Sequence, residues 1–150
     1  MWGNALAMQL HTRLSEDLDF QSWKSSKSQK QEVDWVNIEK QLAKIGTIQA
    51  REIWDFNHVE FNVSGVKITF YACDKYSPVE HPIFVMNNLF IADIKSIAAM
   101  KMEVLLRRSS FRDYYDLYSI FKDGENFKEI VDLALKYSEH KLTTKIYLQC

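Results

Sequence analysis

Two carboxylates near the start of the chain are separated by one apolar residue, in the sequence SEDLDF at positions 15–20. Residues i and i+2 of a strand point to the same face of a sheet, so Asp17 and Asp19 are expected to share a face. Leu18 and Phe20 are then expected to turn to the core. Mg²⁺ prefers oxygen ligands and is often held by one or two carboxylates together with substrate phosphates. The pair is therefore a candidate site for Mg²⁺ or Mn²⁺, although a solvated acidic turn is the plainer interpretation.

A glycine stands at the entrance of a helix expected over residues 4–13. Gly3 precedes the sequence NALAMQLHTR, which is rich in helix formers, and Asn4 is a suitable N-cap. The start of a helix attracts phosphate through its free N–H groups and its dipole, and glycine lets the phosphate approach closely. A phosphate-binding helix start followed by a carboxylate pair is the arrangement that nucleotidyl transfer needs. By itself, however, such a glycine is also what an ordinary loop contains.

A lysine lies in the middle of the apolar face of a helix expected over residues 96–108. Positions 94, 97 and 104 on this face are isoleucine or valine, and Lys101 lies among them. Its ammonium must either reach solvent along the apolar surface or meet an anion.

A second pair of aspartates follows on the next expected helix, over residues 112–121. Asp113 and Asp116 are three residues apart and therefore share a helical face. Three arginines flank the turn between the two helices, at positions 107, 108 and 112. One interpretation is a helix pair joined by ordinary ion pairs. The other is a cluster of Lys101 and arginines that binds phosphate and is oriented by the aspartates.

The spacing of apolar residues predicts the elements that must position these side chains. Period-two alternation over residues 58–63 and 66–70, around Ser64-Gly65, predicts a β-hairpin. The polar sequence KSSKSQKQ, at residues 24–31, is typical of a mobile loop. Helix and strand are mixed, which predicts an α+β fold with a helical C-terminal third. The other expected elements are strands over residues 17–20, 47–56 and 83–91, and helices over residues 32–45, ended by Gly46, and 127–137.

Length and composition exclude several classes of protein. The chain has 150 residues and a formal net charge of -1, which suits one domain and indicates no general affinity for nucleic acid. No apolar run approaches the roughly 20 residues needed to span a bilayer. Two cysteines, Cys73 and Cys150, predict neither a disulfide framework nor a zinc site and fit a reducing cytoplasm.

Two blocks of the sequence resemble a known family. WGNALAMQLHTRLSEDLDF, from position 2, is similar to the opening motif of the AbiEii/AbiGii-type nucleotidyltransferase toxins, approximately GGTALALQLGHRxSxDLDFF. AAMKMEVLLRRSSFRDYYDLY, from position 98, is similar to the second block of that family, roughly AAMKxxAIxxRxxxRDxxDLYFL. The blocks occur in the expected order, about 80 residues apart, with the hairpin between them.

The resemblance implies the DNA polymerase β-like nucleotidyltransferase fold, a small mixed sheet flanked by helices. We expect a core over residues 1–91, shortened at its N-terminus relative to the family, and a helical part over residues 92–150 that packs on the same domain. The implied activity is metal-dependent transfer of a nucleotide from a nucleoside triphosphate to an acceptor, expected to be tRNA, in a cytoplasmic toxin controlled by an antitoxin. The residues implied in catalysis are Asp17, Asp19, Lys101 and Asp113, with Asp17 and Asp19 on the metal. Those implied in nucleotide binding are Gly3, Asn4, Ser15, Lys101 and Arg112.

The sequence also departs from the family pattern. Trp2 and Asn4 replace a glycine and a threonine of the first motif, and Trp2 would crowd the expected phosphate position. Polymerase β-like enzymes usually carry a third carboxylate on a neighbouring strand. The sequence GVKITFY offers Lys67 and Thr69 there instead. Glu60 is the nearest candidate for the third carboxylate, and Asp116 is a further auxiliary acid. An inactive module that binds through the same fold is therefore an alternative. A third possibility is an interaction protein that docks through tyrosines 114, 115 and 118, although most of these are more simply explained as core residues.

Overall fold

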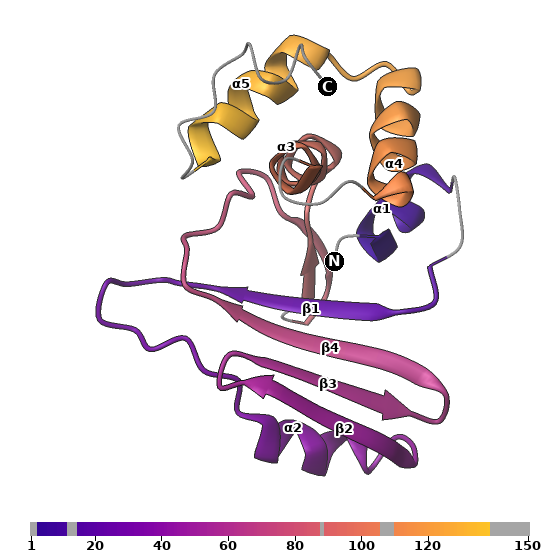
Figure 1. Cartoon of the computed structure of the whole chain (residues 1–150), viewed down its shortest axis with the longest axis vertical. Coiled ribbons are helices and arrows are strands. Elements are labelled where there is room, and N and C mark those ends of the chain that lie inside the picture. Colours follow the sequence, from indigo (N-terminus) through magenta and orange to yellow (C-terminus); the bar gives the residue numbers. More distant parts are fainter. Residues whose placement is uncertain (1–2, 12–14, 88, 106–109, 139–150) are drawn as a thin grey trace. The chain divides into compact units, whose positions relative to one another are not determined.

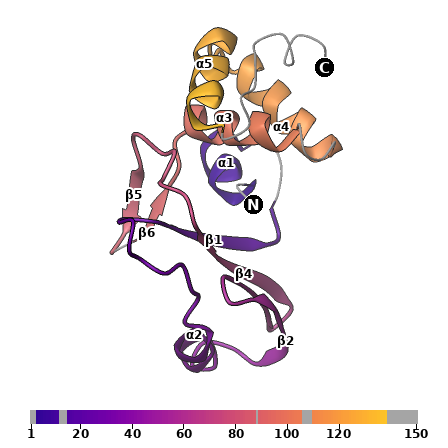
Figure 2. The same cartoon turned by 60° about the vertical axis from the view of Figure 1, so that its left-hand side comes forward.

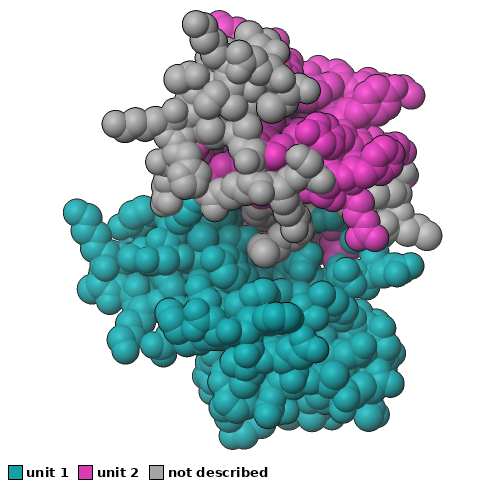
Figure 3. All heavy atoms as spheres, in the orientation of Figure 1, with its two compact units in different colours: residues 1, 3, 14–77 teal, residues 2, 4–13, 78–150 magenta. Residues whose placement is uncertain are grey.

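The computed structural model describes residues 3–11, 15–87, 89–105 and 110–138. Within these ranges the chain forms five helices and two small sheets, which can be followed in Figure 1 and, from another direction, in Figure 2. This composition confirms the predicted α+β class. The described residues group into two compact units, one with Gly3 and residues 15–77 and the other with residues 4–11 and the described residues from 78 to 138 (Figure 3). The domain division expected after residue 91 stays a prediction.

The first unit is built on a four-stranded mixed sheet. Its strands stand in the order β1-β4-β3-β2, with β1 parallel to β4 and the other two pairs antiparallel (Figure 1). The predicted hairpin is confirmed as β3 and β4, whose turn has positive φ angles at both Ser64 (51°) and Gly65 (86°), as a type I′ turn requires. The strand bounds are Leu18–Trp23 for β1, Ile48–Asp55 for β2, His58–Val63 for β3 and Val66–Cys73 for β4.

One face of this sheet carries the core of the unit. Leu42 of the helix α2 (Trp35–Leu42) packs there against Val59, Phe61, Val63 and Ile68. The helix is shorter than the span expected over residues 32–45. The preceding segment is held extended, because the Val33 N–H donates to the Phe56 carbonyl (2.9 Å), and Asp34 then caps the helix.

The second unit consists of α1 (Gly3–Leu10), a small hairpin and three helices. The strand expected over residues 83–91 is instead two antiparallel strands, β5 (Ile83–Met86) and β6 (Leu89–Ile91). Asn4 lies inside α1, which begins one residue earlier, so the expected N-cap position is wrong. Buried side chains such as Ile97, Ile120 and Ile130 form the core among α3 (Ile94–Leu105), α4 (Phe111–Lys122) and α5 (Phe127–Tyr137).

The helices in the described ranges have at most 12 residues. None of them is both long enough and apolar enough to cross a membrane.

Candidate active site

The first unit carries a row of polar side chains on the face of its sheet opposite the core. Alternation along each strand places these residues there, because their neighbours in sequence belong to the core face. Across the sheet, the row runs from Asp19 of β1 through Thr69 of β4 and Glu60 of β3 to Glu52 of β2. The carboxylate of the first predicted motif is thus brought into one row with the auxiliary acid Glu60.

The apolar residues next to the carboxylate pair are less buried than expected. Leu18 and Phe20 turn to the core side of the sheet as predicted, but they keep 40% and 37% of their surface exposed. They lie beside Ile68 and Phe70, and the Phe20 ring stacks on the Phe70 ring at 5.3 Å between centroids. The reason for their exposure is that β1 is an edge strand.

A lysine lies beside the carboxylates. The Lys67 ammonium is 2.8 Å from a carboxylate oxygen of Glu60. Their hydrogen bond raises the pKa of Lys67, partial burial opposes this, and the Glu60 charge raises the pKa further. The negative charges of Asp17 and Asp19 add to the rise, which shows that both carboxylates lie within electrostatic range of one ammonium. Lys67 is therefore part of the same group of charged side chains.

An unfilled hydrogen-bond acceptor lies further along β1. The side-chain oxygen of Gln21 is buried and has no hydrogen-bond partner. Gln21 follows Asp19 by two residues, so alternation directs its side chain to the same face. Because a buried polar atom without a partner is costly, this oxygen is suited to receive a donor from a ligand. Sequence reasoning missed Gln21, although the continued i, i+2 spacing could have indicated it.

The oxygen-rich donor set of this face fits a hard divalent cation. Asp17 and Asp19 offer carboxylate oxygens, which such ions prefer. In the part of the chain that the structure describes, no group of three or more His, Cys, Asp or Glu side chains is placed to hold a metal ion. A cation held by the pair would therefore complete its coordination with water and substrate phosphates, which is a common way for proteins to bind Mg²⁺.

The second unit holds a buried cluster of one lysine and two aspartates. The Lys101 ammonium of α3 is 3.0 Å from an oxygen of Asp113 and 2.7 Å from an oxygen of Asp116, both on α4. Lys101 is 3% exposed and Asp116 is 0% exposed. Of the two predicted outcomes for Lys101, the structure thus shows that it meets an anion. The pairing also explains why Asp113 and Asp116 are spaced three apart, since both must face α3.

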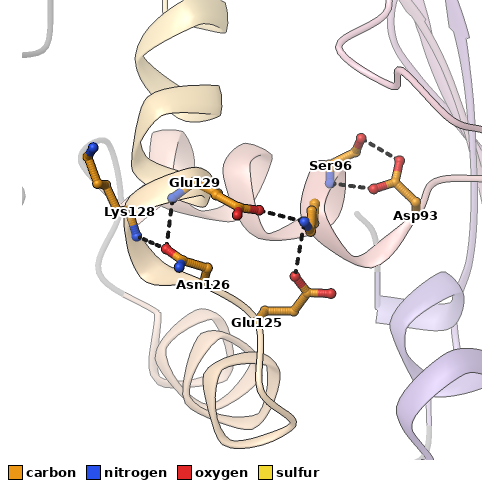
Figure 4. A network of polar contacts seen from close by, with 7 residues as sticks. Asp93, Ser96, Glu125, Asn126, Lys128 and Glu129 are labelled. Atoms are coloured by element: carbon orange, nitrogen blue, oxygen red, sulfur yellow. Dashed lines mark hydrogen bonds and ion pairs between the residues drawn. The ribbon is translucent and has the colours of Figure 1, made fainter.

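A network of polar contacts caps the helix of Lys101 and joins it to α5 (Figure 4). Asp93 caps α3 by accepting from the Ser96 N–H (3.0 Å) and hydroxyl (2.6 Å). The Lys95 ammonium lies 2.6 Å from a carboxylate oxygen of Glu129 of α5 and 3.9 Å from a carboxylate oxygen of Glu125. The Asp93 cap sets the start of α3, and the Lys95 pairs link the surface of α3 to Glu125 and to α5.

The remaining predicted residues are less closely associated. Gly3 is the first residue of α1, which gives it the predicted place at a helix start. Ser15 is half-buried, and Arg112 is exposed at the start of α4. Trp2, Arg107 and Arg108 lie outside the described residues. Ser15, Asp17, Asp19 and Glu60 fall in the first unit and Asn4, Lys101, Arg112, Asp113 and Asp116 in the second, so each group is considered by itself.

The tyrosines of α4 are not core residues. Tyr114, Tyr115 and Tyr118 keep 44%, 41% and 61% of their surface exposed, so the expectation that most of them are buried is wrong. Together with Phe111 they have the spacing of one helical face, and the opposite face carries the two aspartates that bind Lys101. The inward side of α4 carries these aspartates together with the buried Leu117 and Ile120.

The mixed sheet of the first unit and the helices of the second are consistent with a nucleotidyltransferase fold. The match to a family model is consistent with it. Residues 3–149 match the family of the nucleotidyl transferase AbiEii toxin of type IV toxin–antitoxin systems, and the chain belongs to this family.

The chain is also similar to an uncharacterized protein, aq_aa25, of Aquifex aeolicus (strain VF5). The two are 30% identical over 141 residues, which cover 89% of this chain and 63% of the relative. The chain thus spans less than two thirds of the length of this curated relative.

Proposed function

We propose that this chain transfers a nucleotide from a nucleoside triphosphate to a hydroxyl group of tRNA, with Mg²⁺ or Mn²⁺ as cofactor. The observation that carries the proposal is the face of the sheet that presents Asp19 in one row with Glu60, with Lys67 within electrostatic range of both Asp17 and Asp19. Membership of a nucleotidyl transferase toxin family supports it. A cognate antitoxin would be the protein partner, and the cytoplasm the place of action.

In the proposed reaction, the acceptor hydroxyl oxygen forms a bond to the α-phosphorus and the hydroxyl proton is released to solvent. The bond from the α-phosphorus to the α,β-bridging oxygen breaks, and pyrophosphate leaves. Asp17 and Asp19 would hold the cation, which when bound neutralises the triphosphate and stabilises charge in the transition state. The start of α1, at Gly3 and Asn4, would receive a phosphate. Ser15 would bind phosphate or cap the turn beside the pair.

The buried cluster of the second unit has proposed roles of its own. Asp113 would orient Lys101, which the 3.0 Å contact between them supports. Lys101 would bind a phosphate, and the exposed Arg112 would guide the nucleotide or the RNA. Glu60 and Asp116 would be auxiliary acids.

A second candidate function is nucleotide binding without turnover. The observation that favours it is the burial of Lys101, whose ammonium would have to leave two aspartates before it could bind a phosphate. Such a module would keep the carboxylate face and lose the transfer step.

Transfer of a labelled nucleotide distinguishes the two functions. The protein is incubated with total tRNA, Mg²⁺ and each α-³²P-labelled nucleoside triphosphate in turn, and the RNA is separated on a denaturing gel. Nucleotidyl transfer predicts label in tRNA with at least one nucleotide, and none when EDTA replaces Mg²⁺. Absence of label with all nucleotides, in a folded protein that binds nucleotide, would leave the binding module as the better account.

A further inference from the structure

Lys67 stands on the strand next to the carboxylate pair. Leu18 of β1 pairs with Ile68 of β4. Asp17 directly precedes Leu18 and Lys67 directly precedes Ile68, so Asp17 and Lys67 are neighbours across the parallel strands. This is the neighbouring strand on which a third acid was expected. A cationic side chain therefore occupies a position where an additional metal ligand would have been placed.

Glu60 holds this lysine in position. The Lys67 ammonium and the Glu60 carboxylate are 2.8 Å apart, and the Glu60 side chain keeps only 21% of its surface exposed. The Lys67 side chain keeps 45% exposed, so a ligand on this face can reach it. The result is a pre-positioned positive charge within range of Asp17 and Asp19.

A fixed ammonium changes how many metal ions such a site can bind. Two-metal phosphoryl-transfer sites hold their ions about 3.5–4 Å apart, which requires carboxylates shared between them. An ammonium among the carboxylates repels a second cation, and it already supplies part of the positive charge that a second cation would bring. Lysine also binds phosphate well as a point charge.

We propose that Lys67 takes the place of a second metal ion, so that the site binds one divalent cation per nucleotide, while Glu60 acts as the positioning residue for Lys67. The inference rests on the proposed function, because it assumes that Asp17 and Asp19 hold a cation together with a triphosphate.

The number of bound Mn²⁺ ions tests this proposal. Mn²⁺ is counted by electron paramagnetic resonance in the presence of a saturating non-hydrolysable nucleoside triphosphate, after subtraction of the Mn²⁺ bound to free nucleotide. The wild type is expected to bind one ion and Lys67→Glu, which adds a carboxylate, two. Lys67→Met is expected to keep one ion and to bind the triphosphate about tenfold to a hundredfold more weakly, because a charge-assisted contact is lost.

Lys27→Glu is the matched control, because it makes the same charge change at an exposed loop position and should bind one ion. Circular dichroism shows that each variant is folded. Two ions in the wild type, one ion in folded Lys67→Glu, or unchanged triphosphate affinity in Lys67→Met would each overturn the role of Lys67 and leave the proposed function standing. No Mn²⁺ on the wild type would overturn both.

Discussion

The Asp19→Asn variant is expected to transfer nucleotide at least about 10³-fold more slowly than the wild type. An amide oxygen is a neutral and weaker ligand than a carboxylate, so the cation would be held poorly. Metal stabilisation of the transition state is worth several kcal/mol, and each 1.4 kcal/mol corresponds to a factor of ten in rate. The rate of label transfer to tRNA at saturating nucleotide measures the effect.

The fold should tolerate this change. Asparagine has nearly the same shape as aspartate, and Asp19 lies half-buried on an edge strand. Glu16→Gln is the matched control, because it also converts an acid to an amide in the same short segment, at an exposed position. It should transfer nucleotide as fast as the wild type. A rate in folded Asp19→Asn within tenfold of the wild type would show that the predicted pair does not carry the chemistry.

The Lys101→Met variant is expected to lose about 3–5 kcal/mol of its free energy of unfolding. Lys101 is paired with Asp113 and Asp116 in a buried cluster, and its removal leaves two aspartates without this counter-charge. A buried charge without its partner costs far more than an intact buried pair contributes. Urea denaturation followed by circular dichroism measures the change.

Two further variants separate this cause from a general loss of packing. Lys95→Met removes an exposed lysine of the same helix, paired with Glu129, and should change the stability little. Replacing the whole cluster, with Lys101→Met, Asp113→Leu and Asp116→Leu together, should recover much of the loss, because apolar side chains often substitute for a buried ion pair. Equal losses in Lys95→Met and Lys101→Met would contradict the assignment of the cost to buried charge.

The local spacing of apolar and turn residues predicted those helices and strands whose geometry is set by residues within the same segment. The hairpin of β3 and β4 follows from two alternating runs around Ser64-Gly65, because the turn type itself needs positive φ angles there. A lysine in an apolar stripe must either reach solvent or pair with an anion. The sequence therefore predicted the anionic partner of Lys101 as one of two outcomes. The spacing along the chain made Asp17, Asp19 and Asp113 candidates, and the family resemblance added the catalytic roles expected of them.

Features that depend on the order of strands could not be predicted in the same way. The exposure of Leu18 and Phe20 follows from the position of β1 at the edge of the sheet, which alternation does not encode. The tyrosines of α4 are exposed because the opposite side of the helix, with its two aspartates, Leu117 and Ile120, is the buried one. Lys67 was visible as a departure from the family pattern, but its pairing with Glu60 required the register of β3 and β4.

The most direct test of the carboxylate face is a calorimetric titration with a non-hydrolysable nucleoside triphosphate, with and without Mg²⁺. The wild type should bind the triphosphate only when Mg²⁺ is present, and the folded variant Asp17→Asn/Asp19→Asn should not bind it in either condition. Equal binding with and without Mg²⁺, or binding in the double variant as tight as in the wild type, would contradict a metal-dependent nucleotide site on this face.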